Sequence, residues 1–170
     1  MKYPVRTRIL HWLTAIAIFA ALLIGFTMTN VIGSHGTLVA VHVTLGVSIL
    51  VIVIARVANR FTHKTPPLPD TVGPWEAKLV VGSELSLYAL MLAQPLVGWA
   101  MVSAAGLPVR VFGAIALPHI APFDADLYGV LRQAHSVLAY LLVAAVAAHV
   151  SAVLLHTLTL RDGMLSRMTR

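Results

Sequence analysis

Four long stretches of apolar residues constrain this chain more than any other feature. An apolar stretch of 18 or more residues is long enough for an α-helix to cross the hydrocarbon core of a bilayer. The stretches cover about residues 9–32, 37–55, 79–104 and 133–160. Only 11% of the residues are charged, against roughly 25% in an ordinary soluble domain. The sequence therefore predicts an integral membrane protein with four spanning helices.

The connections between the stretches predict how these helices are arranged. Short connections favour an up-and-down antiparallel bundle, so we expect a single all-α membrane domain over residues 1–170. The connection 56–78 is rich in proline and charged residues, which is typical of an exposed loop. The apolar segment "VRVFGAIALPHI", Val109–Ile120, lies between the third and fourth stretches. We expect it to form a short interfacial helix.

The distribution of lysine and arginine predicts the orientation. Ten of the twelve basic residues flank one side of the expected bundle, and the positive-inside rule places that side in the cytoplasm. Both termini are therefore expected in the cytoplasm, with the chain crossing the membrane four times. The formal net charge of +6 is better explained by topology and contact with lipid headgroups than by nucleic-acid binding. The two exceptions are Arg110 and Arg132.

Four histidines lie within the apolar stretches, where ionisable residues are costly and usually have an internal partner. His11 and His149 fall toward the cytoplasmic side, and His42 and His135 toward the external side. His135 and His149 are separated by roughly 21 Å along a helix and offset by about 40°, so they share one face. The sequence therefore predicts two opposed pairs at two depths, His11–His149 and His42–His135.

The available ligand types restrict what such pairs can bind. The chain has no cysteine, which excludes thiolate metal sites, iron–sulfur clusters and covalently attached c-type haem. Zinc requires a tetrahedral set, and di-iron bundles require several glutamates, whereas Glu84 is the one carboxylate in these stretches. Axial ligation of haem iron needs only two histidines on opposite helices. We therefore expect two b-type haems; the alternative is structural histidines bonded to carbonyls or facing headgroups.

The motifs around these histidines resemble the bacterial four-helix di-haem cytochrome b561 family, which is related to the cytochrome b subunits of hydrogenases and formate dehydrogenases. The resemblance implies axial haem ligation by the same four histidines. Many relatives have a histidine where this chain has Glu84. The matching segments are "R-x-x-HW" from Arg8, "HVTLGVSIL" from His42, "RVANR" from Arg56, "TPPLP" from Thr65, "QPLVGWAMVSAAGLPVRVFG" from Gln94, "HSVLAY" from His135 and "AAHVSAVLLHTLTLRDGMLSRM" from Ala147.

The resemblance also implies electron transfer between membrane quinone and a partner at the other face. Some relatives are superoxide oxidases, which take electrons from external superoxide and reduce ubiquinone. Superoxide is therefore the favoured donor, and no catalytic residue is assigned. Two alternatives stay open. One is a haem b subunit that serves a separate enzyme or a periplasmic carrier, and the other is a non-redox membrane protein with structural histidines.

Two residues near the cytoplasmic side are candidates for a quinone site. His156 follows His149 by about two turns on nearly the same face. A quinone needs a hydrogen-bond donor and a proton source, and an imidazole supplies both; the alternative is contact with headgroups. Trp12 would line the same pocket, although tryptophan at a membrane edge more often serves as an interfacial anchor.

Four arginines are candidates for contact with anions. Arg8 and Arg56 lie near the cytoplasmic histidines, where they would pair with haem propionates or simply set the topology. Arg110 and Arg132, on the external side, would pair with propionates there or attract an anion such as superoxide. The remaining histidines are expected to be solvated; they are His35, His63 and His119.

Overall fold

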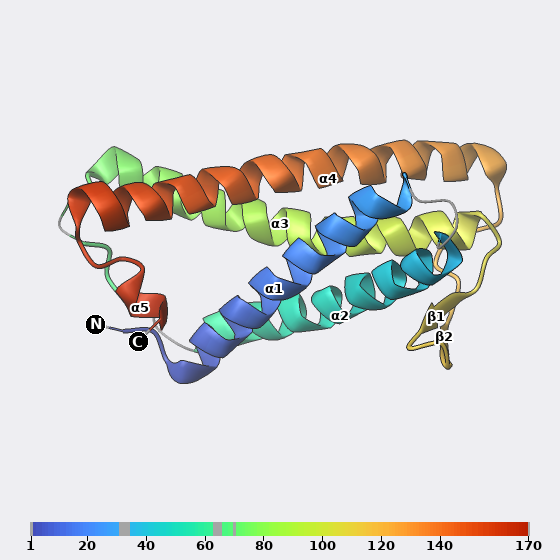
Figure 1. The fold of residues 1–170 in the computed structure, drawn as a ribbon, viewed down its shortest axis with the longest axis horizontal. Coiled ribbons are helices and arrows are strands. Elements are labelled where there is room, and N and C mark those ends of the chain that lie inside the picture. The colour runs from blue at the N-terminus through green and yellow to red at the C-terminus, as the bar shows by residue number, and fades with distance from the viewer. Residues whose placement is uncertain (1, 31–34, 63–65, 70, 170) are drawn as a thin grey trace.

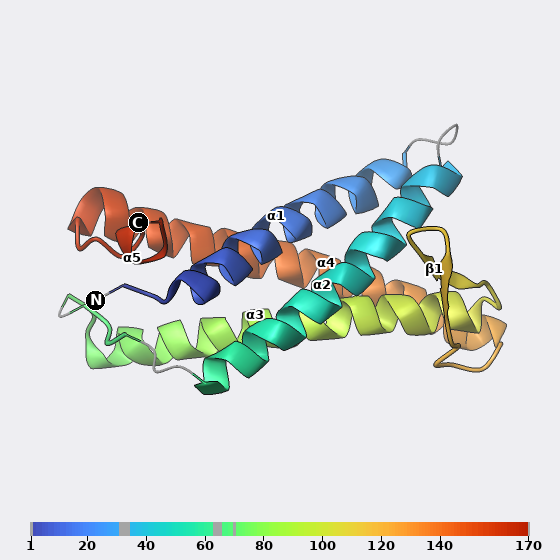
Figure 2. The same ribbon diagram turned by 90° about the horizontal axis from the view of Figure 1, so that it is seen from below.

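Four long helices run side by side along the molecule (Figures 1 and 2). The structure is a computed structural model that describes residues 2–30, 35–62, 66–69 and 71–169. Each helix is long and apolar enough to span a membrane. The prediction of an all-α membrane bundle with four spans is therefore confirmed. The helices are α1 (Val5–Met28), α2 (His35–Thr62), α3 (Pro74–Ala104) and α4 (Ala125–Leu154).

Successive helices run in opposite directions, so the two chain termini lie at the same end of the bundle (Figure 1). We call this end the terminal end. The opposite end carries a two-stranded hairpin of β1 (Val109–Val111) and β2 (Ile115–Leu117), and we call it the hairpin end. At the terminal end α4 continues as a short π-helix, η1 (Leu155–Leu160), and the chain finishes in α5 (Ser166–Thr169).

The helices extend beyond the apolar stretches that predicted them. α2 continues to Thr62 and α3 begins at Pro74, so part of the expected loop 56–78 is helical. α4 begins at Ala125, well before residue 133. Hydropathy locates only the part of a helix that matches the hydrocarbon core, whereas backbone hydrogen bonding continues into the polar flanks. α1 ends at Met28, and residues 31 and 32 of the first expected span lie outside the described residues.

The expectation of an interfacial helix over Val109–Ile120 is wrong, because this segment contains the hairpin. β1 and β2 pair antiparallel, with Val111 opposite Ile115. The turn between them has positive φ at Phe112 (51°) and Gly113 (72°), and the Ala114 N–H donates to the Val111 carbonyl. Two consecutive positive φ values are typical of the type I′ turn that matches strand twist. Branched side chains on both arms favour strand over helix.

Local signals fix where α3 and α4 begin. The Glu76 carboxylate accepts from the Gly73 N–H at 2.9 Å, one half of a capping box, and Pro74 occupies the first turn. The Asp124 carboxylate caps α4 by accepting from the Leu127 N–H at 2.8 Å. These contacts satisfy backbone donors that have no partner within the helix.

A small apolar core lies midway along the bundle, and apolar side chains also cover the outside. Leu142 is in this core and lies halfway along α4 between His135 and His149. Outward-facing residues such as Ile16 and Leu23 are 67% and 70% exposed, as expected for helices surrounded by lipid. The core consists of Ile18, Ile49, Val53, Met91 and Leu142.

Candidate functional site

The structure brings the four histidines of the spans together as two facing pairs. Near the hairpin end, the rings of His42 from α2 and His135 from α4 have centroids 6.2 Å apart. Toward the terminal end, the rings of His11 from α1 and His149 from α4 have centroids 6.3 Å apart. We call these the hairpin-end pair and the terminal-end pair. The apolar core around Leu142 separates the two levels.

The spacing of both pairs matches two imidazoles that share one metal ion. A bond from a metal ion to an imidazole nitrogen is about 2.0–2.1 Å long, and the nitrogen lies about 1.1 Å from the ring centroid, which gives about 6.3 Å between centroids. The measured values are 6.2 and 6.3 Å. Among the described residues there is no group of three or more His, Cys, Asp or Glu side chains suited to a metal ion. The donor set is therefore two opposed imidazoles, which suits haem iron rather than tetrahedral zinc.

Helix α1 holds the imidazole of His42. The Nδ1 of His42 lies 3.1 Å from the Ala21 carbonyl. A carbonyl only accepts hydrogen bonds, so Nδ1 carries the proton and Nε2 presents its lone pair, the form in which histidine binds a metal. Gly25, one turn beyond Ala21, also faces this ring, and a Cβ built there would lie 3.1 Å from His42 Cε1. Ala21 and Gly25 thus form a cradle that fixes the ring.

Helix α3 contacts His135 differently, at its carbonyl and at the ring nitrogen Nε2. The Gln94 amide donates to the His135 carbonyl at 3.1 Å and lies 3.4 Å from His135 Nε2. Gly98 faces the same ring, and a Cβ there would lie only 2.9 Å from His135 Cε1. His135 Nδ1 and Gln94 Oε1 are buried and have no hydrogen-bond partner in the part of the chain that the structure describes. Buried polar atoms without partners suggest a site built for another group.

A cavity of about 230 Å³ adjoins the hairpin-end pair, and all four long helices contribute to its walls. Gly46 lines it, and a Cβ built on Gly46 would meet nothing within 4 Å. Pro95 also lines it and has no N–H for the helical hydrogen bond to the Met91 carbonyl. A flat, hydrophobic group would fit in this apolar space beside the two facing histidines. Other lining residues include Ile18, Leu22, Ile49, Ala139, Tyr140 and Leu142.

Arginines surround the terminal-end pair. The Arg56 guanidinium donates to His11 Nδ1 at 3.4 Å and lies 5.3 Å from the centroid of the Tyr88 ring. Arg8, one turn before His11, has a buried Nε without a hydrogen-bond partner among the described residues. A buried guanidinium nitrogen with no acceptor favours an anion nearby. Arg56, in contact with His11, and Arg8, one turn before it, are thus the two candidates for haem propionates at the terminal end.

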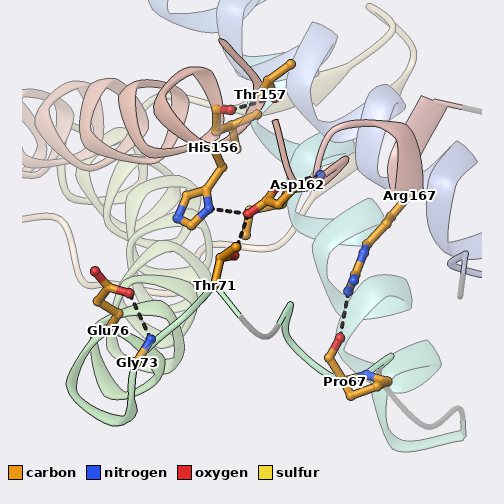
Figure 3. A network of polar contacts seen from close by, with 10 residues as sticks. Pro67, Thr71, Gly73, Glu76, His156, Thr157, Asp162 and Arg167 are labelled. Carbon is orange, nitrogen blue, oxygen red and sulfur yellow. Dashed lines mark hydrogen bonds and ion pairs between the residues drawn. The ribbon is translucent and has the colours of Figure 1, made fainter. Parts of the chain in front are cut away.

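His156 lies in η1 and contacts Asp162 rather than solvent (Figure 3). Its Nδ1 is 2.6 Å from Asp162 Oδ2, and the side chains are 12% and 3% exposed. Thr71 donates to the same oxygen at 2.9 Å, and the Met164 N–H donates to Oδ1 at 3.0 Å. Burial alone would raise the pKa of Asp162, but the hydrogen bonds from His156, Met164 and Thr71 outweigh it and hold the pKa below its ordinary value.

The other candidate residues are spread over both ends. Arg110 is exposed on β1, and Arg132 is exposed on α4. Trp12 is 43% exposed, and its indole N–H donates to the Met168 carbonyl at 3.1 Å. Glu84 forms an ion pair with Arg60, which neutralises its charge. His35 and His119 are exposed, each near a backbone carbonyl, and His63 lies outside the described residues.

Sequence reasoning missed the residues that support the histidines. Gln94 and Gly98 are four residues apart on α3, and so are Ala21 and Gly25 on α1. The two residues of each pair therefore lie on one face of their helix. This spacing can be read from the sequence, but it does not reveal which neighbouring helix that face contacts. Asp162 follows His156 by six residues, which on an α-helix would place it about 120° away. No periodicity in the sequence indicates that contact.

The sequence is similar to known proteins along its whole length. It matches the family described as prokaryotic cytochrome b561 over residues 2–170. A relative in Yersinia pestis, called probable superoxide oxidase CybB, is 30% identical over 128 residues, which are 75% of this chain and 72% of the relative. Cytochrome b561 homolog 2 of Escherichia coli (strain K12) is 28% identical over 174 residues, covering 98% and 90%. Homolog 1 of the same organism is 23% identical over 162 residues, covering 94% and 92%.

Proposed function

Because the chain belongs to the prokaryotic cytochrome b561 family, we propose that it is a di-haem cytochrome carrying electrons from an external donor to membrane quinone. It is a multi-pass membrane protein, and haem b and electron transport follow from the family. The observation that carries the proposal is the presence of two facing histidine pairs at two levels of one bundle, with ring centroids 6.2 and 6.3 Å apart.

Each pair would hold one haem through its two imidazoles. A haem iron held by two histidines passes single electrons rather than binding oxygen, because both axial positions are filled. At the terminal end, Arg8 Nε has no hydrogen-bond partner among the residues that the structure describes, which supports a role in binding a propionate. Arg56 donates to His11 Nδ1, so ligation by His11 through Nε2 would require Arg56 to release that nitrogen. The freed guanidinium would then be available to a second carboxylate.

We infer that the terminal end faces the cytoplasm and that the membrane is the bacterial inner membrane. The excess of lysine and arginine on that side supports the orientation, and membership of a prokaryotic family supports a bacterial membrane. The hairpin end, with Arg110 and Arg132, then faces the periplasm. Electrons would enter near the hairpin-end pair and leave near the terminal-end pair.

Superoxide is the donor that we favour. The similarity to a protein called probable superoxide oxidase supports this choice. Arg110 and Arg132 are exposed at the hairpin end and would raise the local concentration of a small anion. Two superoxide ions would each lose one electron and leave as dioxygen. One ubiquinone would accept the two electrons together with two protons and become quinol.

The quinone would bind at the terminal end, near His156 and Trp12. Both residues contact the C-terminal segment, His156 through Asp162 and Trp12 through the Met168 carbonyl. The two candidates therefore border the same short segment, although they come from opposite ends of the chain. The hydrogen bond from the Trp12 indole to the Met168 carbonyl supports a role for Trp12 beyond that of an interfacial anchor.

The first test measures haem in the purified protein. We expect about two haems per chain, each with axial histidines, and a reduced b-type α-band after dithionite. A colourless protein without this band would contradict the proposal. Stopped-flow mixing with superoxide should then reduce the haem, and added ubiquinone should reoxidise it. Reduction that requires a separate protein would instead identify a haem subunit of a larger system.

Steering is tested with Arg110→Gln, which removes an exposed charge at the hairpin end. We expect slower haem reduction by superoxide, with the difference from the parent shrinking as salt is added, because salt screens exposed charges. Arg6→Gln, at the exposed start of α1 at the other end, is the matched control and should leave this rate unchanged. Equal rates for Arg110→Gln and the parent at low salt would remove Arg110 from the mechanism.

A further inference from the structure

The close contact between His156 and Asp162 is explained neither by the membrane topology nor by the proposed haem sites. The imidazole is bound at one nitrogen, since Nδ1 lies 2.6 Å from Asp162 Oδ2 (Figure 3). Asp162 is 3% exposed and receives two further hydrogen bonds, from Thr71 and from the Met164 N–H. Three donors around one buried carboxyl favour its ionised form. The carboxylate in turn favours a proton on Nδ1.

An unusual backbone brings the two side chains together. η1 is a π-helix, a rare form that often occurs at functional sites. Arg161 follows it in the left-handed region with φ 52°, which costs about 1–2 kcal/mol for a residue with a side chain. The chain reverses there, and the Asp162 N–H returns to the His156 carbonyl at 3.3 Å. Without this reversal, Asp162 would face away from His156.

We propose that Asp162 is a positioning residue that holds His156 by Nδ1 and stabilises its imidazolium, so that Nε2 donates protons to the reduced quinone. This inference rests on the proposed quinone site at His156. As the quinone takes up its two electrons, Nε2 donates two protons in turn, one to each quinone oxygen. The neutral imidazole stays bound to Asp162 through Nδ1, and Nε2 regains a proton from water at the terminal end. The products are quinol and an unchanged His156–Asp162 pair.

A purely structural role for Asp162 would be to anchor the C-terminal segment. That segment has other anchors, however. The Arg167 side chain donates to the Pro67 carbonyl at 2.6 Å. The Arg167 backbone carbonyl accepts from the Tyr3 N–H at 3.2 Å. Anchoring and proton delivery can therefore be separated by substitution. Arg167→Met weakens the anchor and leaves the His156–Asp162 pair intact, so it is the structural control.

The experiment compares Asp162→Asn, Asp162→Glu, His156→Gln and Arg167→Met in the full-length, haem-loaded protein. Each variant is reduced, and its reoxidation by a soluble ubiquinone analogue is followed at several quinone concentrations, with the rate expressed per haem. In histidine–metal sites, loss of the orienting carboxylate lowers function by about 10–100-fold. We expect Asp162→Asn to lower kcat for quinone by about 10-fold or more, with KM changed less than about threefold. Asp162→Glu should restore part of the rate, and Arg167→Met should match the parent.

Two further readouts distinguish proton delivery from folding. Reduction of the haem by dithionite should be equally fast in Asp162→Asn and the parent, because that step does not use His156. In the fully reduced, haem-loaded protein, whose low-spin haems are diamagnetic, the Nδ1 proton of His156 should give a strongly downfield NMR signal that disappears in Asp162→Asn. If Asp162→Asn does not accumulate in the membrane, Thr71→Val, which removes one donor to Asp162, should show a smaller loss of the same kind.

The outcomes separate this inference from the proposed function. If His156→Gln reduces quinone like the parent, the quinone site at His156 is wrong, and the role of Asp162 fails with it. If His156→Gln is slow but Asp162→Asn is normal, the quinone site stands and the role of Asp162 is overturned. If Arg167→Met is as slow as Asp162→Asn, anchoring of the segment explains the effect and proton delivery through Asp162 is rejected.

Discussion

Replacing Gly98 with alanine tests whether the hairpin-end pair is shaped to hold a haem. A Cβ at Gly98 would lie 2.9 Å from His135 Cε1, whereas ordinary contacts are 3.4–4 Å. To restore an ordinary contact, the His135 ring and residue 98 must separate by at least 0.5 Å, the difference between 3.4 and 2.9 Å. Metal–ligand distances tolerate only about 0.2 Å. We expect the haem at this pair to be weakened or lost while the terminal-end haem remains.

The magnitude follows from the cost of overpacking. Inserting a methyl group into a packed site typically costs about 1–3 kcal/mol, equivalent to about 5- to 150-fold weaker binding. Gly25→Ala should have a smaller effect, since its Cβ would lie 3.1 Å from His42 Cε1. The assay is haem content per chain after purification, together with the electron paramagnetic resonance of each ferric haem.

The control for this substitution lies on the same helix. A Cβ at Gly82, also in α3, would meet nothing within 4 Å, so Gly82→Ala should keep both haems and make the helix more stable by about 0.5–1 kcal/mol. Two haems with unchanged spectra at both sites in Gly98→Ala would show that the hairpin-end pair is not closely fitted to haem. Equal loss of haem in Gly82→Ala and Gly98→Ala would show that the effect does not come from contact with His135.

Three further predictions concern the terminal end. His11→Ala should remove about half of the haem, as expected if each of two haems needs both of its axial histidines. Haem content is measured by the pyridine haemochrome assay and coordination by spectroscopy, and two six-coordinate haems in this variant would show that the pairing is wrong. Because the pKa of Asp162 is lowered in the folded protein, its contacts stabilise the fold fully above its ordinary pKa of 3.8. This stabilisation is lost as the pH falls through the lower folded pKa. Hydrogen exchange of residues 162–169 should therefore accelerate only below about pH 4, and acceleration near pH 6 would contradict this prediction. Trp12→Phe removes the hydrogen bond to the Met168 carbonyl, worth about 0.5–1.5 kcal/mol, and faster exchange should be confined to the C-terminal segment; exchange that accelerates across α1 would point to a wider role.

The sequence was sufficient for features that depend on one helix at a time. Long apolar stretches require spanning helices, because a backbone in lipid must satisfy its own hydrogen bonds. Helical geometry alone placed His135 and His149 on one face of a single helix. The depths of His11 and His42 followed from their distances to the ends of their own stretches. Each of these features depends only on spacing along the chain.

Features that depend on contacts between elements needed the tertiary structure. The hairpin at Val109–Leu117 depends on a turn with positive φ at Phe112, which a phenylalanine seldom adopts. The contacts of Gly25 and Gly98 with the imidazoles depend on how closely two helices approach, and sequence periodicity carries no such distance. Asp162 reaches His156 only because a π-helix and a left-handed residue reverse the chain.

The sequence by itself thus determined that the chain spans a membrane, and it predicted which histidines face one another at which depth. Both follow from a fixed rise and rotation per residue along a helix. Only the tertiary structure decided what holds those histidines in place and that His156 is bound to a carboxylate. It also decided that Arg8 Nε is buried without a partner in the described part of the chain. These depend on distances between segments far apart in the chain, and packing sets those distances.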